Sequence, residues 1–200
     1  MSRKNSPEIN AGSMADIAFL LLIFFLVTTT MDVESGILRK IPEKIEENSK
    51  LDIKEKNILQ VSLNFKNEVF VDNNLVKIDD LKQIGMDFID NGGGFDVEGN
   101  PCDWCHGKKL STSSDHPKKA IISIQSDRNT NYETYILVLD AFNSSYTYLR
   151  NKLSIKLHGK SYQALLDEFA KSNYSNKKVE QKIKIIREKY PLLLSDAEIK

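Results

Sequence analysis

One acidic side chain lies inside the most apolar stretch of the sequence. Residues 15–31 contain Asp16 and no basic residue, and residues 17–27 are apolar without a break. Loss of water disfavours the charged form of a carboxyl group, so an acid inside a membrane helix can take up and release protons. This placement predicts a proton carrier. The alternative is an acid at the level of the lipid head groups, where the start of a helix favours negative charge.

The neighbours of Asp16 at helical spacing are small or apolar. Small residues beside the acid would let a partner helix or a water molecule approach closely. A single helix cannot shield the carboxylate from lipid, so partner helices are expected. The residues predicted to share this face and to line a channel or contact a partner helix are Gly12, Ser13, Leu20, Ile23, Val27 and Thr30.

A second chemical motif is the sequence from Cys102 to His106. Its spacing, Cys-x-x-Cys-His, matches the attachment site of c-type haem, in which two thiols bond the porphyrin and the histidine binds iron. The surrounding Gly, Ser, Lys and Asp residues do not provide an apolar haem pocket. A second axial haem ligand would have to come from His116, His158 or Met86.

Two other interpretations of the same motif remain open. A zinc ion could be bound by Cys102, Cys105, His106 and His116, because thiolate and imidazole are the ligands that zinc prefers. A local disulfide between Cys102 and Cys105 suits a protein exported to an oxidising compartment, and we favour it. Such a short loop would mainly fix local shape. No resident cofactor is expected, and protons would be the coupling ion.

The element that must position Asp16 is a helix over residues 11–31. These 21 residues would extend about 31 Å, close to the hydrocarbon thickness of a bilayer. A cleaved signal peptide is the first alternative, but no small-x-small cleavage site follows. A buried core helix is the second, but the rest of the chain is too polar to enclose it. We therefore predict a single transmembrane helix.

Charge patterns indicate how this helix would lie in the membrane. Arg3 and Lys4 precede it on a short tail, which favours a cytoplasmic N-terminus and an exported C-terminal part. The whole chain has 28 basic and 28 acidic residues, so its formal net charge is zero. This balance gives no overall attraction to nucleic acid, and no nucleic-acid partner is expected.

The remaining sequence predicts a tether followed by a small domain. Residues 32–57 contain 13 charged residues and no sustained apolar period, as in a solvated linker. The domain is predicted to contain strands at 58–65, 69–76 and 120–125, a helix at 79–90 capped by Asp79, a helix that begins at Asn131, and a helix at 181–189 that ends before Pro191.

Three segments of the chain resemble the ExbD/TolR family of biopolymer transport proteins. The segment around the acid is the first, and residues 122–134 resemble the strand, loop and helix of the family's periplasmic domain. The ending, residues 190–198, is similar to the tail of ExbD-like proteins from Bacteroidetes-type bacteria. The order of these segments along one chain is more specific than any one of them.

The resemblance implies a function and several partners. Such chains form homodimers whose helices pass through a ring of ExbB-like subunits in the cell inner membrane. Protons pass by the acid of the helix, here Asp16, and the complex drives a TonB-like protein that opens outer-membrane receptors. The TolR branch would instead serve envelope maintenance. The tail favours the ExbD branch.

Together these observations predict the domain organisation. The fold class is a single N-terminal transmembrane helix plus a small α+β periplasmic domain with an extended C-terminal helical region, in which no final strand is recognised. The predicted parts are a cytoplasmic tail (1–10), the transmembrane helix (11–31), a periplasmic tether (32–57), the α+β domain (58–152) with a cysteine-containing insertion (91–118), and the helical extension (153–200).

Other function classes make different predictions. A passive membrane-anchored binding module would tolerate the loss of the Asp16 carboxylate. A haem protein would absorb light in the Soret region. An enzyme is not expected, because the sequence contains no phosphate-binding loop, nucleophile elbow or His-Glu-x-x-His motif.

Overall fold

The computed structural model describes residues 11–29 and 53–197, with the side chains of the first helix described from Gly12 to Thr28. The chain divides into two units, Met1–Lys50 and Leu51–Lys200.

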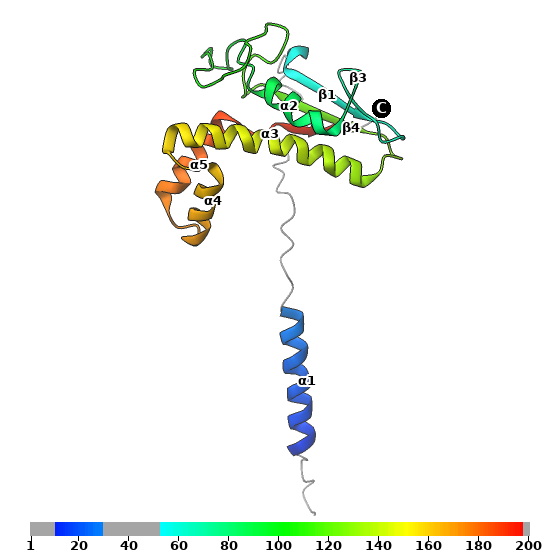
Figure 1. The fold of residues 1–200 in the computed structure, drawn as a ribbon. Helices are drawn as coiled ribbons and strands as arrows, with labels where there is room; N and C mark the ends of the chain where they lie inside the picture. The colour runs from blue at the N-terminus through cyan, green and yellow to red at the C-terminus, as the bar shows by residue number, and fades with distance from the viewer. Residues whose placement is uncertain (1–10, 30–52, 198–200) are drawn as a thin grey trace, which may run out of the picture. The chain divides into compact units, whose positions relative to one another are not determined.

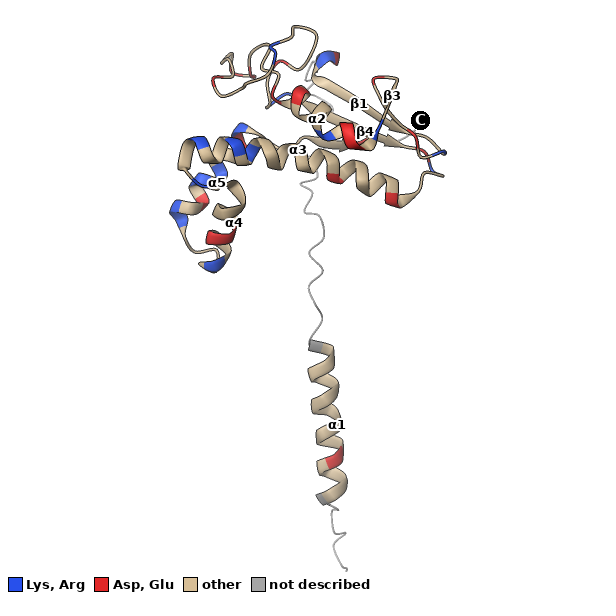
Figure 2. Cartoon of the chain, in the orientation of Figure 1, with Lys and Arg blue, Asp and Glu red and all other residues tan. Residues whose placement is uncertain are grey.

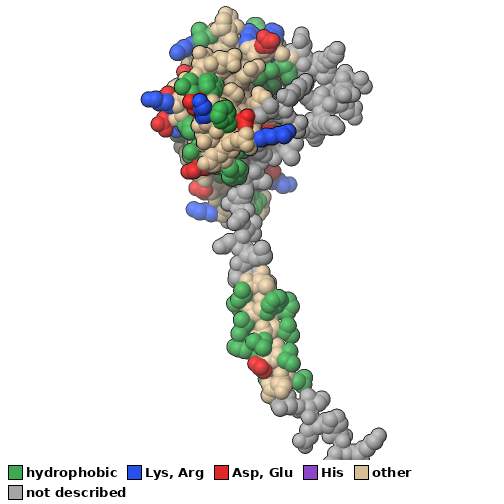
Figure 3. Space-filling model, turned by 90° about the vertical axis from the view of Figure 1, so that its right-hand side faces the viewer, with side chains coloured by type: hydrophobic (Ala, Val, Ile, Leu, Met, Phe, Trp, Pro, Cys, Tyr) green, Lys and Arg blue, Asp and Glu red, His purple; other side chains and the backbone are tan. Residues whose placement is uncertain are grey.

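The first unit contains helix α1, Ala11–Thr29. Its large apolar side chains are exposed along its length, and Figure 3 shows one face of the helix. Among the residues that the structure describes, no helix is both long enough and apolar enough to cross a membrane. Residues 30 and 31 of the predicted span lie outside the described residues.

The second unit is built on one mixed sheet of five strands (Figure 1). The strand order is β3-β2-β1-β4-β5. The first three strands along the chain pair antiparallel, whereas β4 runs parallel to β1 and β5 runs parallel to β4. The strands are β1 Ile58–Leu63, β2 Val69–Val71, β3 Asn74–Val76, β4 Ile121–Ser126 and β5 Leu194–Asp196.

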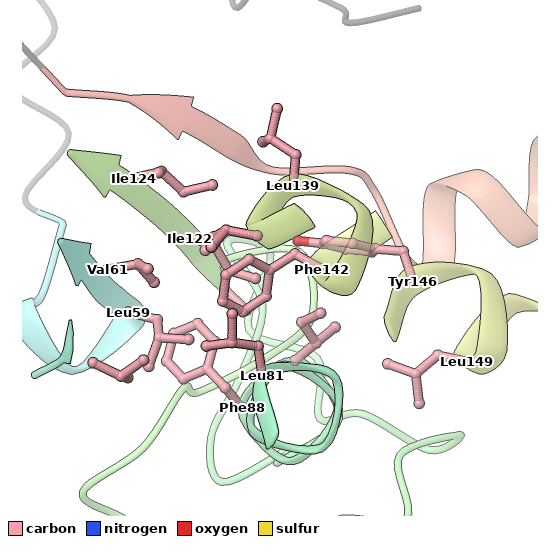
Figure 4. Close-up of a cluster of buried hydrophobic side chains, with 14 of the residues drawn as sticks. Leu59, Val61, Leu81, Phe88, Ile122, Ile124, Leu139, Phe142, Tyr146 and Leu149 are labelled. Carbon is pink, nitrogen blue, oxygen red and sulfur yellow. The ribbon is translucent and has the colours of Figure 1, made fainter. Parts of the chain in front are cut away.

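Two helices cover one face of this sheet. Helix α2 spans Ile78–Ile89 and helix α3 spans Tyr132–His158. In the central strands, alternate side chains point toward these helices and are buried, as a sheet with one covered face requires (Figure 4). The core joins Leu59, Val61, Ile122 and Ile124 of the sheet to Leu81, Phe88, Leu139, Phe142, Tyr146 and Leu149 of the helices.

The C-terminal region adds a helical hairpin to this domain. Helix α4 spans Tyr162–Lys171 and helix α5 spans Lys177–Lys189. The side chains of Ser161 and Asn176 accept hydrogen bonds from backbone N–H groups in the first turns of these helices, as N-caps do. The two helices bury a separate apolar cluster made of Tyr162, Leu165, Val179, Ile183 and Ile186.

The predicted small α+β domain is present, with several corrections to its elements. The strand predicted at 69–76 is two strands, β2 and β3, because Asp72 and Asn73 form a turn with positive φ angles of 46° and 67°. The residue before α2 is Lys77, which provides no side-chain cap, so Asp79 lies inside the helix and does not cap it. Helix α3 does begin after Asn131, whose side chain accepts from the N–H of Glu133.

The end of the chain differs from the prediction. Helix α5 begins at Lys177, four residues before the predicted start, and it ends at Lys189, before Pro191. A final strand, β5, follows it, although the sequence was expected to contain none there. Three residues are too few to show the alternation of a strand, so β5 is defined by its pairing with β4.

Candidate functional site

The first candidate site is Asp16 on α1. It is the only charged residue in that helix, and it lies one and a half turns from the N-terminal end. Asp16 is exposed. The other described members of its predicted face are exposed too: Gly12, Ser13, Leu20, Ile23 and Val27. The predicted member Thr30 lies outside the described residues. Figure 3 shows the acidic side chain of α1 among hydrophobic ones.

This arrangement presents a carboxylate on an apolar surface. At the end of the helix, Thr28 donates a hydrogen bond from its hydroxyl to the carbonyl of Phe24, 2.9 Å away, so its polar group is satisfied within the helix. The Asp16 carboxylate cannot be satisfied in the same way. An ionised carboxylate only accepts hydrogen bonds, and the backbone N–H groups inside a helix are already used by the helix. A carboxylate placed in this way requires water or a partner outside the helix.

The second candidate site is the loop of residues 91–118. Cys102 and Cys105 are joined by a disulfide with a Cα–Cα distance of 5.5 Å. Because the two sulfurs are bonded to each other, neither is a thiolate that could bind zinc or bond a porphyrin. In the described ranges, no group of three or more His, Cys, Asp or Glu side chains is placed to hold a metal ion.

The two histidines of this loop differ in how far they are buried. His106 is exposed, whereas His116 is buried and contacts the Trp104 ring edge-on at 5.2 Å between centroids. Burial lowers the pKa of His116, and its Nδ1 accepts a hydrogen bond from the N–H of Lys118 at 3.1 Å. The ring is therefore neutral and packs as part of the loop. Met86 is partly buried against the main core.

Two residues that the sequence analysis missed hold this loop in place. Asp90 caps the end of α2 and accepts from the Tyr190 hydroxyl at 2.5 Å and from the N–H of His106 at 3.1 Å. Asn91 donates to the carbonyls of Leu110 and Ser114, at 2.9 and 2.7 Å, and accepts from the N–H of Leu110. Both are buried, so the loop is fixed to the domain by polar contacts.

An open groove of about 800 Å³ lies beside this loop. It is bounded by α2, by the start of β1, by the turn at residues 72–73 and by residues 106–113. Its charged lining has both signs: it contains Lys56 and Lys108 together with Glu55, Asp72 and Asp87. The mixture favours no one class of charged ligand.

Comparison with known proteins identifies the class of the chain. A family model described as biopolymer transport protein ExbD/TolR matches residues 2–154. The match includes α1 with Asp16, strands β1 to β4, α2 and most of α3. No curated protein matches the chain.

The chain therefore belongs to the ExbD/TolR family of biopolymer transport proteins. Proteins of this family are transport subunits that generally work with ExbB-like and TonB-like partners. The family match ends within α3, so the hairpin of α4 and α5 and the strand β5 lie beyond it.

Proposed function

We propose that this chain is an ExbD-like subunit of an inner-membrane motor that converts the proton motive force into mechanical energy for TonB-dependent outer-membrane transport. One observation carries the proposal: a chain of this transport family has a single carboxylate, Asp16, in an otherwise uncharged apolar helix. An ionisable group in such a helix is costly unless it has a function.

In this proposal α1 is the membrane anchor. Members of the family are typically anchored in the inner membrane and carry a periplasmic domain. The apolar sequence continues past the described part of α1 to residue 31, which gives 21 residues and a length of about 31 Å as a helix. The N-terminal tail, with Arg3 and Lys4, would remain in the cytoplasm, and the α+β domain would lie in the periplasm.

Asp16 would act as the proton carrier within a ring of ExbB-like subunits. Protonation removes its charge, so the neutral helix can move through surroundings that oppose the charged one. The small residues Gly12 and Ser13 would allow close approach of the ring helices. Movement of one charge through 100 mV supplies about 2.3 kcal/mol, so one mechanical stroke would use several protons. A second copy of this chain would provide the other helix of a dimer.

Two other functions would use Asp16 differently. A TolR-like subunit would use the same acid for envelope maintenance and not for nutrient uptake. A passive membrane-anchored periplasmic binding module would not need the acid at all.

The Asp16→Asn variant tests the role of the carboxylate. Asparagine keeps the size and polarity of the side chain but cannot exchange a proton. We expect proton-gradient-dependent uptake of a TonB-type substrate to be lost in cells whose only copy is this variant. Copurification of the ExbB-like partner with the variant would show that the complex is still assembled.

The control is Asp16→Glu, which keeps the carboxyl group and should retain part of the uptake. Normal uptake and an intact envelope in Asp16→Asn cells would contradict the motor and favour the anchored module. Normal uptake together with a loss of envelope integrity would instead identify the TolR-like function.

A further inference from the structure

The C-terminal helical region, defined here as residues 150–190, is strongly basic. It contains eleven Lys and Arg and four Asp and Glu, a formal charge of +7 in a chain whose total is zero. Residues 53–149 contain ten basic and fourteen acidic residues, so the two parts of the domain have opposite charge. Figure 2 shows the basic residues gathered at the end of α3 and on α5, whereas α4 also carries acidic residues. This region would attract an anionic surface.

The two arginines of the region are used within the fold. Arg150 donates through Nε and Nη2 to the carbonyl of Tyr190, at 3.0 and 2.7 Å. Arg187 donates from Nε to the Tyr162 hydroxyl at 2.7 Å. These contacts join α3, α4 and α5 and leave the lysines as the source of the external positive charge.

The lysines lie on the outer side of the hairpin. Helix α5 turns Val179, Ile183 and Ile186 inward and exposes Lys177, Lys178 and Lys184. Lys156, Lys177 and Lys178 form no salt bridge with any residue in the described ranges. Their charge is therefore available to a partner outside this domain.

Apolar side chains are exposed between these lysines. Ile155 and Leu157 at the end of α3 are 56% and 45% exposed, and Ile185 of α5 is 42% exposed. Lysines beside exposed aliphatic side chains are typical of helices that lie at a membrane surface, where the charge meets head groups and the apolar groups enter the acyl boundary. An acidic protein surface would account for the lysines but not for these apolar neighbours.

The length of the chain keeps this region near a membrane. Residues 30–52 are 23 residues, which can span at most about 80 Å in any conformation. If α1 is anchored as proposed, the domain cannot move farther than this from the bilayer. Tethering raises the effective concentration of the membrane surface, so a weak attraction is enough for contact.

We propose that the lysines of the C-terminal helical region bind the anionic phospholipid head groups of the membrane that holds α1. This inference rests on the proposed membrane anchor. It gives the domain a second, charge-dependent contact with the membrane. Most of the region that would make this contact, residues 155–190, lies beyond the family match.

Energy transfer between fluorophores tests this inference in the full chain. A donor dye is attached to Tyr174→Cys, in the exposed turn between α4 and α5, where it is the only free thiol because Cys102 and Cys105 are bonded. Acceptor dyes are placed on the head groups of two bilayers, phosphatidylcholine alone and a one-to-one mixture with phosphatidylglycerol. We expect higher transfer in the anionic bilayer and its loss in high salt.

The test variant combines Lys177→Gln, Lys178→Gln and Lys184→Gln. Each lysine near an anionic surface strengthens binding about fivefold. Loss of three lysines should therefore lower the docking equilibrium constant roughly a hundredfold and reduce the docked fraction. The matched control combines Lys66→Gln, Lys77→Gln and Arg128→Gln, which removes three exposed charges from the sheet domain and should change little.

The outcomes separate the two proposals. A chain that carbonate extracts from the vesicles contradicts the anchor and with it this inference. An inserted chain with equal transfer in both bilayers overturns only the lipid contact. Equal losses in the test variant and the control would also overturn it, because they would show a general charge effect.

Discussion

Single polar side chains order the loop of residues 91–118. Asp96 accepts hydrogen bonds from the N–H groups of Glu98 and Asn100 at 2.9 and 2.8 Å, and it pairs with Lys118 at 3.2 Å. These contacts close a turn that is followed by the disulfide. The donors, first of all the N–H of Asn100, lower the pKa of Asp96 from its ordinary value of 3.8 to about 2.

This shift predicts a pH dependence of stability. A carboxylate with a lowered pKa stabilises the folded state fully above pH 3.8, and this contribution is lost as the pH falls through about 2. Asp96→Asn should therefore melt at a lower temperature than the natural chain at neutral pH, and the difference should shrink between pH 4 and pH 2. Thermal unfolding followed by circular dichroism at several pH values measures this.

The control for this prediction is Asp140→Asn, on the exposed surface of α3. It should change the melting temperature equally little at each pH. A melting difference for Asp96→Asn that stays constant down to pH 2 would contradict the role given to its ionised form.

Some of these residues could be predicted from the sequence and others could not. Asn131 was predicted as a helix start because an N-cap uses only the backbone of the next three residues. Asp90 and Asn91 were missed because their partners are distant: Tyr190 is 100 residues from Asp90, and Leu110 is 19 residues from Asn91. A polar residue before three glycines has the local pattern of an exposed turn, and its burial depends on the tertiary fold.

At the level of elements, α2 and α3 approach each other at Gly85. A Cβ atom at this position would lie 2.7 Å from the Ser145 Oγ and 3.0 Å from Cδ1 of Phe142. The same Ser145 hydroxyl bonds to the carbonyls of Lys82 and Ala141, so it cannot easily move. Glycine is therefore required here by close packing between helices, and not by its backbone angles.

Gly85→Ala tests this contact. The added methyl group should overpack the interface at a cost of about 1–3 kcal/mol, partly offset by about 1 kcal/mol from the better helix propensity of alanine. We expect a net loss in the free energy of unfolding, measured with urea. Addition of Ser145→Ala should make the double variant more stable than the sum of the single effects; strict additivity would contradict the close contact.

The elements show the limits of local sequence patterns. The two strands β2 and β3 were read as one because their apolar residues continue across Asp72 and Asn73, whereas both residues adopt the positive φ that a tight hairpin turn requires. The helical hairpin was predicted only in part. A helix was predicted at 181–189, whereas α5 begins after its N-cap residue, Asn176. By contrast, the start of α3 was predicted correctly from Asn131, because an N-cap is a local signal.

Across the whole domain, the end of the chain returns to complete the sheet. Strand β5 pairs with β4, Tyr190 bonds to Asp90 at the end of α2, and Arg150 of α3 bonds to the Tyr190 carbonyl. The C-terminal region is thus connected to the sheet, to α2 and to α3. The family match ends at residue 154, but the structural domain does not end there.

A chain that stops after Gly159 should therefore be damaged. It would leave the edge of β4 unpaired. It would also remove the Tyr190 partner of the buried Asp90 and of the partly buried Arg150, which costs up to about 1–3 kcal/mol for each group. An uncovered strand edge also promotes association between chains. We expect a lower melting temperature and higher oligomers in size-exclusion chromatography.

A chain that stops after Ala197 is the matched control, because it keeps β5 and all of these contacts. It should behave as the full chain does. A monomeric Gly159 truncation with unchanged melting would show that the C-terminal region is an appendage to the domain.

The position of β5 has a consequence for biosynthesis. The ribosome adds β5 only after β4, α3, α4 and α5, and in the described domain β4 has no partner on that side until β5 arrives. A nascent or prematurely terminated chain would therefore present an open strand edge to its neighbours. Completion of this sheet is expected only after β5 has left the ribosome, and a holding chaperone would have its greatest effect before that point.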